Sequence, residues 1–99
     1  MRSDPHARAV MRLSPTDNVA VALRALKAGE VVVLDGETFI VPRAIAVGHK
    51  LAARAIAEGE TIIKYGCPIG ITTRPIAAGE HVHTHNTKSS YLPPAIQSA

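Results

Sequence analysis

The sequence predicts one small domain of the α+β class, mostly β with one or two short helices. Short Val- and Ile-rich runs alternate with Gly and Pro, Asp35-Gly36 is a strong hairpin signal, and four glycine turns resemble one another. A chain of 99 residues has room for a single core. With no Trp, one Phe and two Tyr, that core is expected to consist of small and branched side chains.

The first half is predicted to contain a strand, a helix and a hairpin. Val10 to Leu13 is expected to open the domain as a strand. Asp17-Asn18 is suited to cap a helix over 19–26, because a short side-chain oxygen accepts hydrogen bonds from the first helical turn and apolar residues recur there at helical spacing. Residues 30–34 and 37–41 are then expected to pair around the Asp35-Gly36 turn.

The second half is predicted to be mainly strands between two less ordered ends. Residues 51–56 fit a single helical turn. The strands are expected at 61–64, 69–73 and 80–83. For the whole chain we expect a flexible lead-in over 1–9, a folded domain over 10–88 and an extended tail over 89–99.

An internal repeat is the most informative feature of the sequence. Each of four segments has an apolar residue, two spacers, a glycine and, in three cases, a glutamate. The glycines are expected to adopt positive φ in tight turns that lead into strands. Their unequal separations of 19, 11 and 20 residues argue against a solenoid and favour corner turns of a folded-over β structure. The glycines are Gly29, Gly48, Gly59 and Gly79.

Composition excludes several function classes. The single cysteine, Cys67, cannot form an intramolecular disulfide, and a cytoplasmic location is expected. No apolar run approaches the roughly 20 residues of a membrane span, so no membrane role is expected. The net charge of +3 is spread over isolated basic residues with few aromatics, which argues against nucleic acid and suits an anionic small molecule such as a carboxylate.

The segment His81-Val82-His83-Thr84-His85-Asn86 is the strongest candidate for chemistry. On a strand the three histidines would share one face, and neutral imidazoles are ligands for Fe, Zn or Mn. Positions i and i+4 of a strand lie about 13 Å apart, so all three could hold one ion only if the strand bends. The alternative is a solvated or interface-facing histidine strip.

Three further residues are candidates for a site. His49 and Lys50 could bind a carboxylate or take a proton, although two polar residues on a turn need no such role. Lys64 precedes a glycine turn and could approach an anionic ligand, or lie on the surface without one. Cys67 fits a buried or half-buried thiol better than a nucleophile, because no base is identifiable beside it.

Three motifs, in this order, resemble the N-terminal domain of the altronate/galactarate dehydratase family. They are GHKLA at 48–52, IIKYGCPIG at 62–70 and GEHVHTHN at 79–86, and the similarity runs over about residues 10–88. The resemblance implies an SAF-type β-clip fold. In that family the small domain precedes a larger catalytic region that dehydrates a sugar acid to a 2-keto-3-deoxy acid, and sulfolactate sulfo-lyase divides the two parts between chains.

The resemblance therefore implies the small subunit of a hydro-lyase, with a large catalytic subunit as partner, a sugar acid as substrate and Fe or Mn in the complete enzyme. The alternatives are a ligand-binding or lid module without catalysis, and a structural homo-oligomer that associates through exposed strands. On the matching positions the expected roles are catalytic for His49, Lys50 and Lys64, substrate-binding for Lys64 and Asn86, and metal-binding for His81, His83 and His85.

Overall fold

The computed structural model describes residues 9–89, and in this range the chain forms nine short strands and no helix. Consequently no helix that could span a membrane exists among these residues. The strands form three antiparallel sheets, of order β1-β2-β5-β8, β3-β4 and β6-β7-β9. Their bounds are β1 Val10–Met11, β2 Val19–Ala22, β3 Val31–Leu34, β4 Glu37–Ile40, β5 Lys50–Ala52, β6 Thr61–Lys64, β7 Cys67–Thr72, β8 His81–Val82 and β9 Thr87–Lys88.

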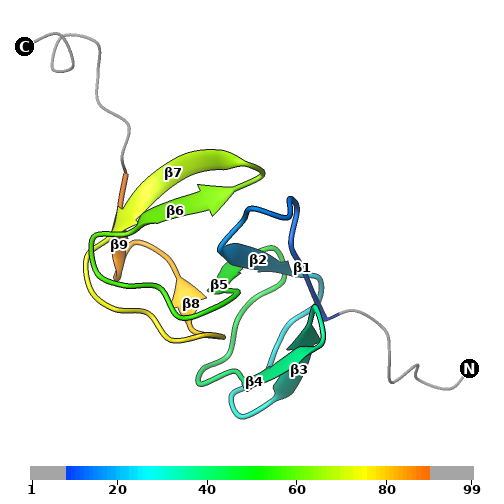
Figure 1. Ribbon diagram of the computed structural model, residues 1–99. Coiled ribbons are helices and arrows are strands. Elements are labelled where there is room, and N and C mark those ends of the chain that lie inside the picture. The colour runs from blue at the N-terminus through cyan, green and yellow to red at the C-terminus, as the bar shows by residue number, and fades with distance from the viewer. Residues whose placement is uncertain (1–8, 90–99) are drawn as a thin grey trace, which may run out of the picture.

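The four-stranded sheet lies between the other two and separates two cores (Figure 1). Because side chains alternate along a strand, Ala20 and Ala22 of β2 enter the first core while Val19 enters the second. In β5, Leu51 enters the first core and Ala52 the second. The small side chains allow both faces of the β2–β5 pair to be buried.

The chain is built from two similar units with an offset of 30 or 31 residues. Gly29 and Gly59 occupy equivalent turns, as do Gly48 and Gly79, and all four have φ between 79° and 86°. In each unit, the apolar residues that stand three positions before the two glycines exchange backbone hydrogen bonds. These pairs are Leu26–Ile45 and Ile56–Ile76. The four predicted corner turns are therefore two pairs.

Each unit also carries a hairpin with the same two-residue turn. Asp35-Gly36 joins β3 to β4, and Tyr65-Gly66 joins β6 to β7. All four residues have positive φ, which a type I′ turn requires. A bulge between Ile62 and Ile63 distinguishes the second hairpin from the first. The predicted strands at 30–34, 37–41 and 61–64 are confirmed, and those at 10–13, 69–73 and 80–83 correspond to β1, β7 and β8.

Both predicted helices are wrong. Residues 19–26 form β2, a bend and the bridge residue Leu26, and residues 51–56 form the end of β5, a bend and the bridge residue Ile56. Alternating Val and Ala satisfy a buried strand as well as a helical face, and strand pairing with β1 and β5 decides between them. Except for Ala9 and Ser89, the predicted lead-in and tail lie outside the described residues.

Asp17 caps a backbone turn, although a different one from the predicted helix start. Its buried carboxylate accepts hydrogen bonds from the N–H groups of Ser14, Tyr65 and Gly66, at 3.0, 2.8 and 2.8 Å. Burial alone would raise the pKa of this carboxyl, but the backbone donors lower it below its ordinary value of 3.8. Asp17 thus ties the segment before β2 to the β6–β7 turn.

We expect Gly79→Ala to destabilise the fold more than Gly48→Ala. Both substitutions place a side chain at positive φ, which costs about 1 to 2 kcal/mol. A Cβ at residue 48 meets open space, whereas one at residue 79 would lie 2.7 Å from Phe39 Cδ1 and 3.0 Å from the Ile40 carbonyl oxygen. Overpacking adds about 1 to 3 kcal/mol. Urea unfolding of both variants measures the free energy of unfolding that each loses. Equal losses would contradict the close approach of Phe39 and Ile40 to residue 79.

Asp17→Asn is expected to lose about 1 to 3 kcal/mol at neutral pH, because the amide NH₂ would face backbone donors that now bond to a carboxylate. The lowered pKa means that the folded wild type binds fewer protons than the unfolded chain. The extra stability of the wild type over Asp17→Asn is therefore complete above pH 3.8. It disappears as the pH falls through the lowered pKa that Asp17 has in the folded state. Denaturant unfolding at several pH values measures this, and a gap independent of pH would contradict it.

Candidate functional site

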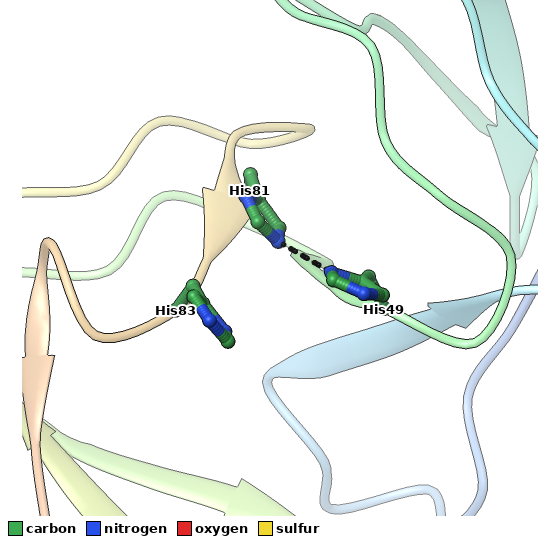
Figure 2. Close-up of side chains that lie close together, drawn as sticks. All are labelled: His49, His81 and His83. Atoms are coloured by element: carbon green, nitrogen blue, oxygen red, sulfur yellow. Dashed lines mark hydrogen bonds between the residues drawn. The ribbon is translucent and has the colours of Figure 1, made fainter.

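Three histidines from two parts of the chain come together beside the central sheet. His49 immediately precedes β5, His81 begins β8, and His83 follows β8 (Figure 2). His49 Nδ1 lies 3.1 Å from His81 Nε2, and one nitrogen from each of the three rings lies within 4.8 Å of the others. The His81 and His83 rings are stacked, with centroids 5.3 Å apart and an interplanar angle of 9°.

Strand pairing produces this approach. β5 and β8 are antiparallel neighbours, with Lys50 opposite Val82 and Leu51 opposite His81. Val82 and Leu51 are buried, so the register is fixed by apolar side chains. His49 and His81 consequently lie side by side on the β5–β8 pair, although they are 32 residues apart in the sequence.

The strand expected at 80–83 ends at Val82, so His83 and His85 lie beyond it. A turn follows, held by the fully buried Asn86. The Asn86 Oδ1 accepts from the His83 N–H, and its Nδ2 donates to the His81 carbonyl oxygen. The turn brings the His85 ring to 5.6 Å from that of His81, much closer than a straight strand would.

His49 occupies a position that is glutamate in the other three turns. Glu30, Glu60 and Glu80 each accept a hydrogen bond from the backbone N–H three residues earlier, at 3.0 Å. An imidazole takes the place of this capping carboxylate in the second turn, and its ring points to His81 (Figure 2). The repeat therefore supplies the backbone position, and one changed residue supplies the third histidine.

The electrostatic environment favours neutral imidazole at His81. Partial burial, followed by the nearby His49, His83, His85 and Lys50, lowers the pKa of His81 below its ordinary value of 6.5. Burial and then the charge of Lys64 lower the pKa of Lys50. Neutral imidazole nitrogens have a lone pair available for a metal ion or for a proton.

The three rings fit the donor set of a divalent transition metal. At metal–nitrogen bonds of about 2.1 Å, neighbouring ligand atoms lie about 3.0 to 3.4 Å apart, which the His49–His81 pair already satisfies. His83 is exposed, so its side chain can rotate toward the pair. The structure groups His49, rather than His85, with His81 and His83. The same 3.1 Å separation also suits a hydrogen bond between two neutral rings.

The remaining predicted site residues lie around this triad. Lys50 and Lys64 are partly buried and close enough for the charge of Lys64 to affect Lys50. Asn86 lies beneath the turn with its amide bonded to backbone, and its substrate-binding role stays a prediction. Cys67 is exposed, so the prediction of a buried or half-buried thiol is wrong. Arg43 is absent from the residues predicted from the sequence, although aligning the four turns would have identified it.

The comparisons with known proteins agree with the motifs. The chain is 46% identical over 80 residues to an altronate dehydratase of Escherichia coli, covering 81% of this chain and 16% of that protein. It is 40% identical over 83 residues to an altronate dehydratase of Bacillus subtilis, covering 84% and 17%. It is 55% identical over 51 residues to the (2R)-sulfolactate sulfo-lyase subunit alpha of Chromohalobacter salexigens, covering 52% and 54%.

This chain therefore spans about a sixth of the length of the altronate dehydratases that it matches, and about half of the sulfo-lyase subunit. A family model described as the altronate/galactarate dehydratase SAF domain matches residues 8–90. Since that match covers most of its length, the chain belongs to the altronate/galactarate dehydratase SAF domain family.

Proposed function

We propose that this chain is the small subunit of a sugar-acid dehydratase and contributes to the mouth of an active site on a separate large chain. The observation that carries the proposal is the His49–His81–His83 triad, which lies at one edge of a domain of this family. The relatives named altronate dehydratase contain this domain as a small part of a longer chain. The relatives named subunit alpha support a division of the enzyme between chains.

The proposed reaction is β-elimination of water from a sugar acid. A base removes the proton α to the carboxylate, the C–O bond at the β carbon breaks, and the leaving hydroxide takes up a proton to become water. The resulting enol converts to the 2-keto-3-deoxy acid. Lys50 is the candidate to move a proton, and Lys64 is the candidate to hold an anionic group. His49 could take a proton only with its ring nitrogen free of metal, so in the metal-bound enzyme we assign it to the metal site.

His49, His81 and His83 would hold an Fe or Mn ion in the complete enzyme, with ligands added by the large chain. Such an ion would stabilise negative charge that develops on the substrate. Within residues 9–89 no carboxylate is grouped with the three histidines, although hard divalent ions such as Mn²⁺ favour oxygen ligands. This is a physical reason to assign the other ligands to a partner.

An exposed apolar surface supports docking of a partner chain. Val31, Val33 and Ile40 lie on the face of the β3–β4 hairpin that points away from the core, with 59%, 59% and 62% of their surface exposed. Val31 and Ile40 are cross-strand partners, so the three side chains form one patch. Contiguous exposed apolar patches are typical of interaction surfaces.

A ligand-binding module without catalysis is the second candidate function. The observation that favours it is the absence of acidic residues from the triad within residues 9–89, which leaves the His49–His81 contact equally suited to a hydrogen-bonded pair. A binding module would take up a small acid without turning it over and would need no large chain.

Co-expression with the large dehydratase-like chain of the same genome is expected to yield a complex that forms 2-keto-3-deoxy acid from at least one of a panel of sugar acids. Each chain alone is expected to be inactive. Ile40→Lys should weaken complex formation because it places a charge in the apolar patch, whereas Glu37→Lys, also on the hairpin but outside the patch, serves as the control.

Activity of the 99-residue chain alone would contradict the subunit proposal. A chain that binds no large partner but does bind a sugar acid would instead support the ligand-binding module.

Substoichiometric Mn²⁺ is expected to broaden the imidazole NMR signals of His49, His81 and His83 first. His81→Ala should weaken Mn²⁺ binding at least about tenfold, because it removes the central ligand. His85→Ala is the matched control, since this ring lies near His81 but outside the triad. Equal losses in the two variants would contradict the triad as the metal site.

A further inference from the structure

Three of the four turns contain the same ion pair between arginine and glutamate. The arginine precedes the glutamate by six residues in Arg24–Glu30, Arg54–Glu60 and Arg74–Glu80. The first two arginines also donate to the carbonyl oxygen of the next residue. In these turns the guanidinium charge is balanced within the turn itself.

The second turn keeps the arginine but not its partner. Arg43 precedes His49 by the same six residues, and the glutamate is replaced by the histidine that points to His81. Arg43 is exposed, and within residues 9–89 it has no ion pair. The residue that completes the histidine triad therefore also deprives Arg43 of the glutamate that the other three turns supply.

Arg43 lines a hollow whose lining also includes His81 and His85. The hollow has a volume of about 570 Å³, within the range of small-molecule sites. Its charged and titratable lining groups are Arg43, Arg74, Glu80, His81 and His85. Arg74 has the loosest of the repeated ion pairs, at 3.7 Å from Glu80. The lining therefore contains two guanidinium groups and one carboxylate.

We propose that Arg43, assisted by Arg74, binds the carboxylate of a small hydroxy acid in this hollow, with the rest of the ligand directed toward His81. A guanidinium presents two parallel N–H donors that match a carboxylate, and it stays charged at all physiological pH values. The inference rests on the proposed function for the class of ligand only. The position of the site follows from the repeat and from the lining of the hollow.

The test uses the full 99-residue chain, with gluconate as the carboxylate and sorbitol as its uncharged analogue, in buffer containing EDTA. Gluconate is expected to shift the amide and side-chain NMR signals of residues 42–44 and 81–85 with a Kd of the order of 1 mM, and sorbitol to shift none. Arg43→Gln should weaken gluconate binding at least about tenfold. Arg24→Gln, the equivalent arginine of the first turn, should leave it unchanged.

A second pair of variants tests the repeat itself. His49→Glu restores the carboxylate of the other turns, which should pair with Arg43 and abolish gluconate binding. His49→Gln removes the imidazole without adding a charge and should retain it. Absence of gluconate-induced shifts in the wild type, or equal weakening by Arg43→Gln and Arg24→Gln, would overturn the proposal. Because EDTA excludes metal and no turnover is measured, failure here is distinguishable from failure of the dehydratase proposal.

Discussion

The pairing of β2 with β5 is the constraint on which the rest of the structure depends. The two strands are paired from Val19–Ala52 to Val21–Lys50, and their side chains alternate between two cores. The β2–β5 pair buries the apolar residues of the first core on one face and those of the second core on the other. Because β5 also pairs with β8, the same strand sets the register that brings His49 to His81.

The duplicated architecture explains how so small a domain acquires a distinct site. Equivalent turns repeat one backbone geometry, with a glycine at positive φ followed by a capping side chain. In three turns that side chain is a glutamate paired with arginine, and the pairing holds the pKa of Glu30 down at about 2. The exception, His49, creates two chemical features at once: a histidine triad, and an Arg43 that has no ion pair within residues 9–89. Both proposals of function therefore rest on the turn where the repeat is broken.

The β hairpins were predictable because their signals are local. Asp35-Gly36 suits a type I′ turn, and the glycines of the corner turns all adopt the positive φ expected of them. The helix predicted over 19–26 failed because alternating Val and Ala fit two periodicities, and only the partner strands distinguish them. Whether the histidine segment bends was left open by the sequence, because the turn depends on hydrogen bonds from the buried Asn86 side chain to the His81 and His83 backbone.

By itself the sequence determined the β-rich class, the hairpin turns, the family motifs and the candidate residues, since each of these depends on neighbours within a few positions. The tertiary structure alone decided that His49 joins His81 and His83, that Asp17 caps a turn 48 residues away, and that Arg43 shares a hollow with Arg74. The first of these associations arises from the register of β5 against β8. Strand register depends on which apolar faces must be buried together, and that is a property of the whole chain.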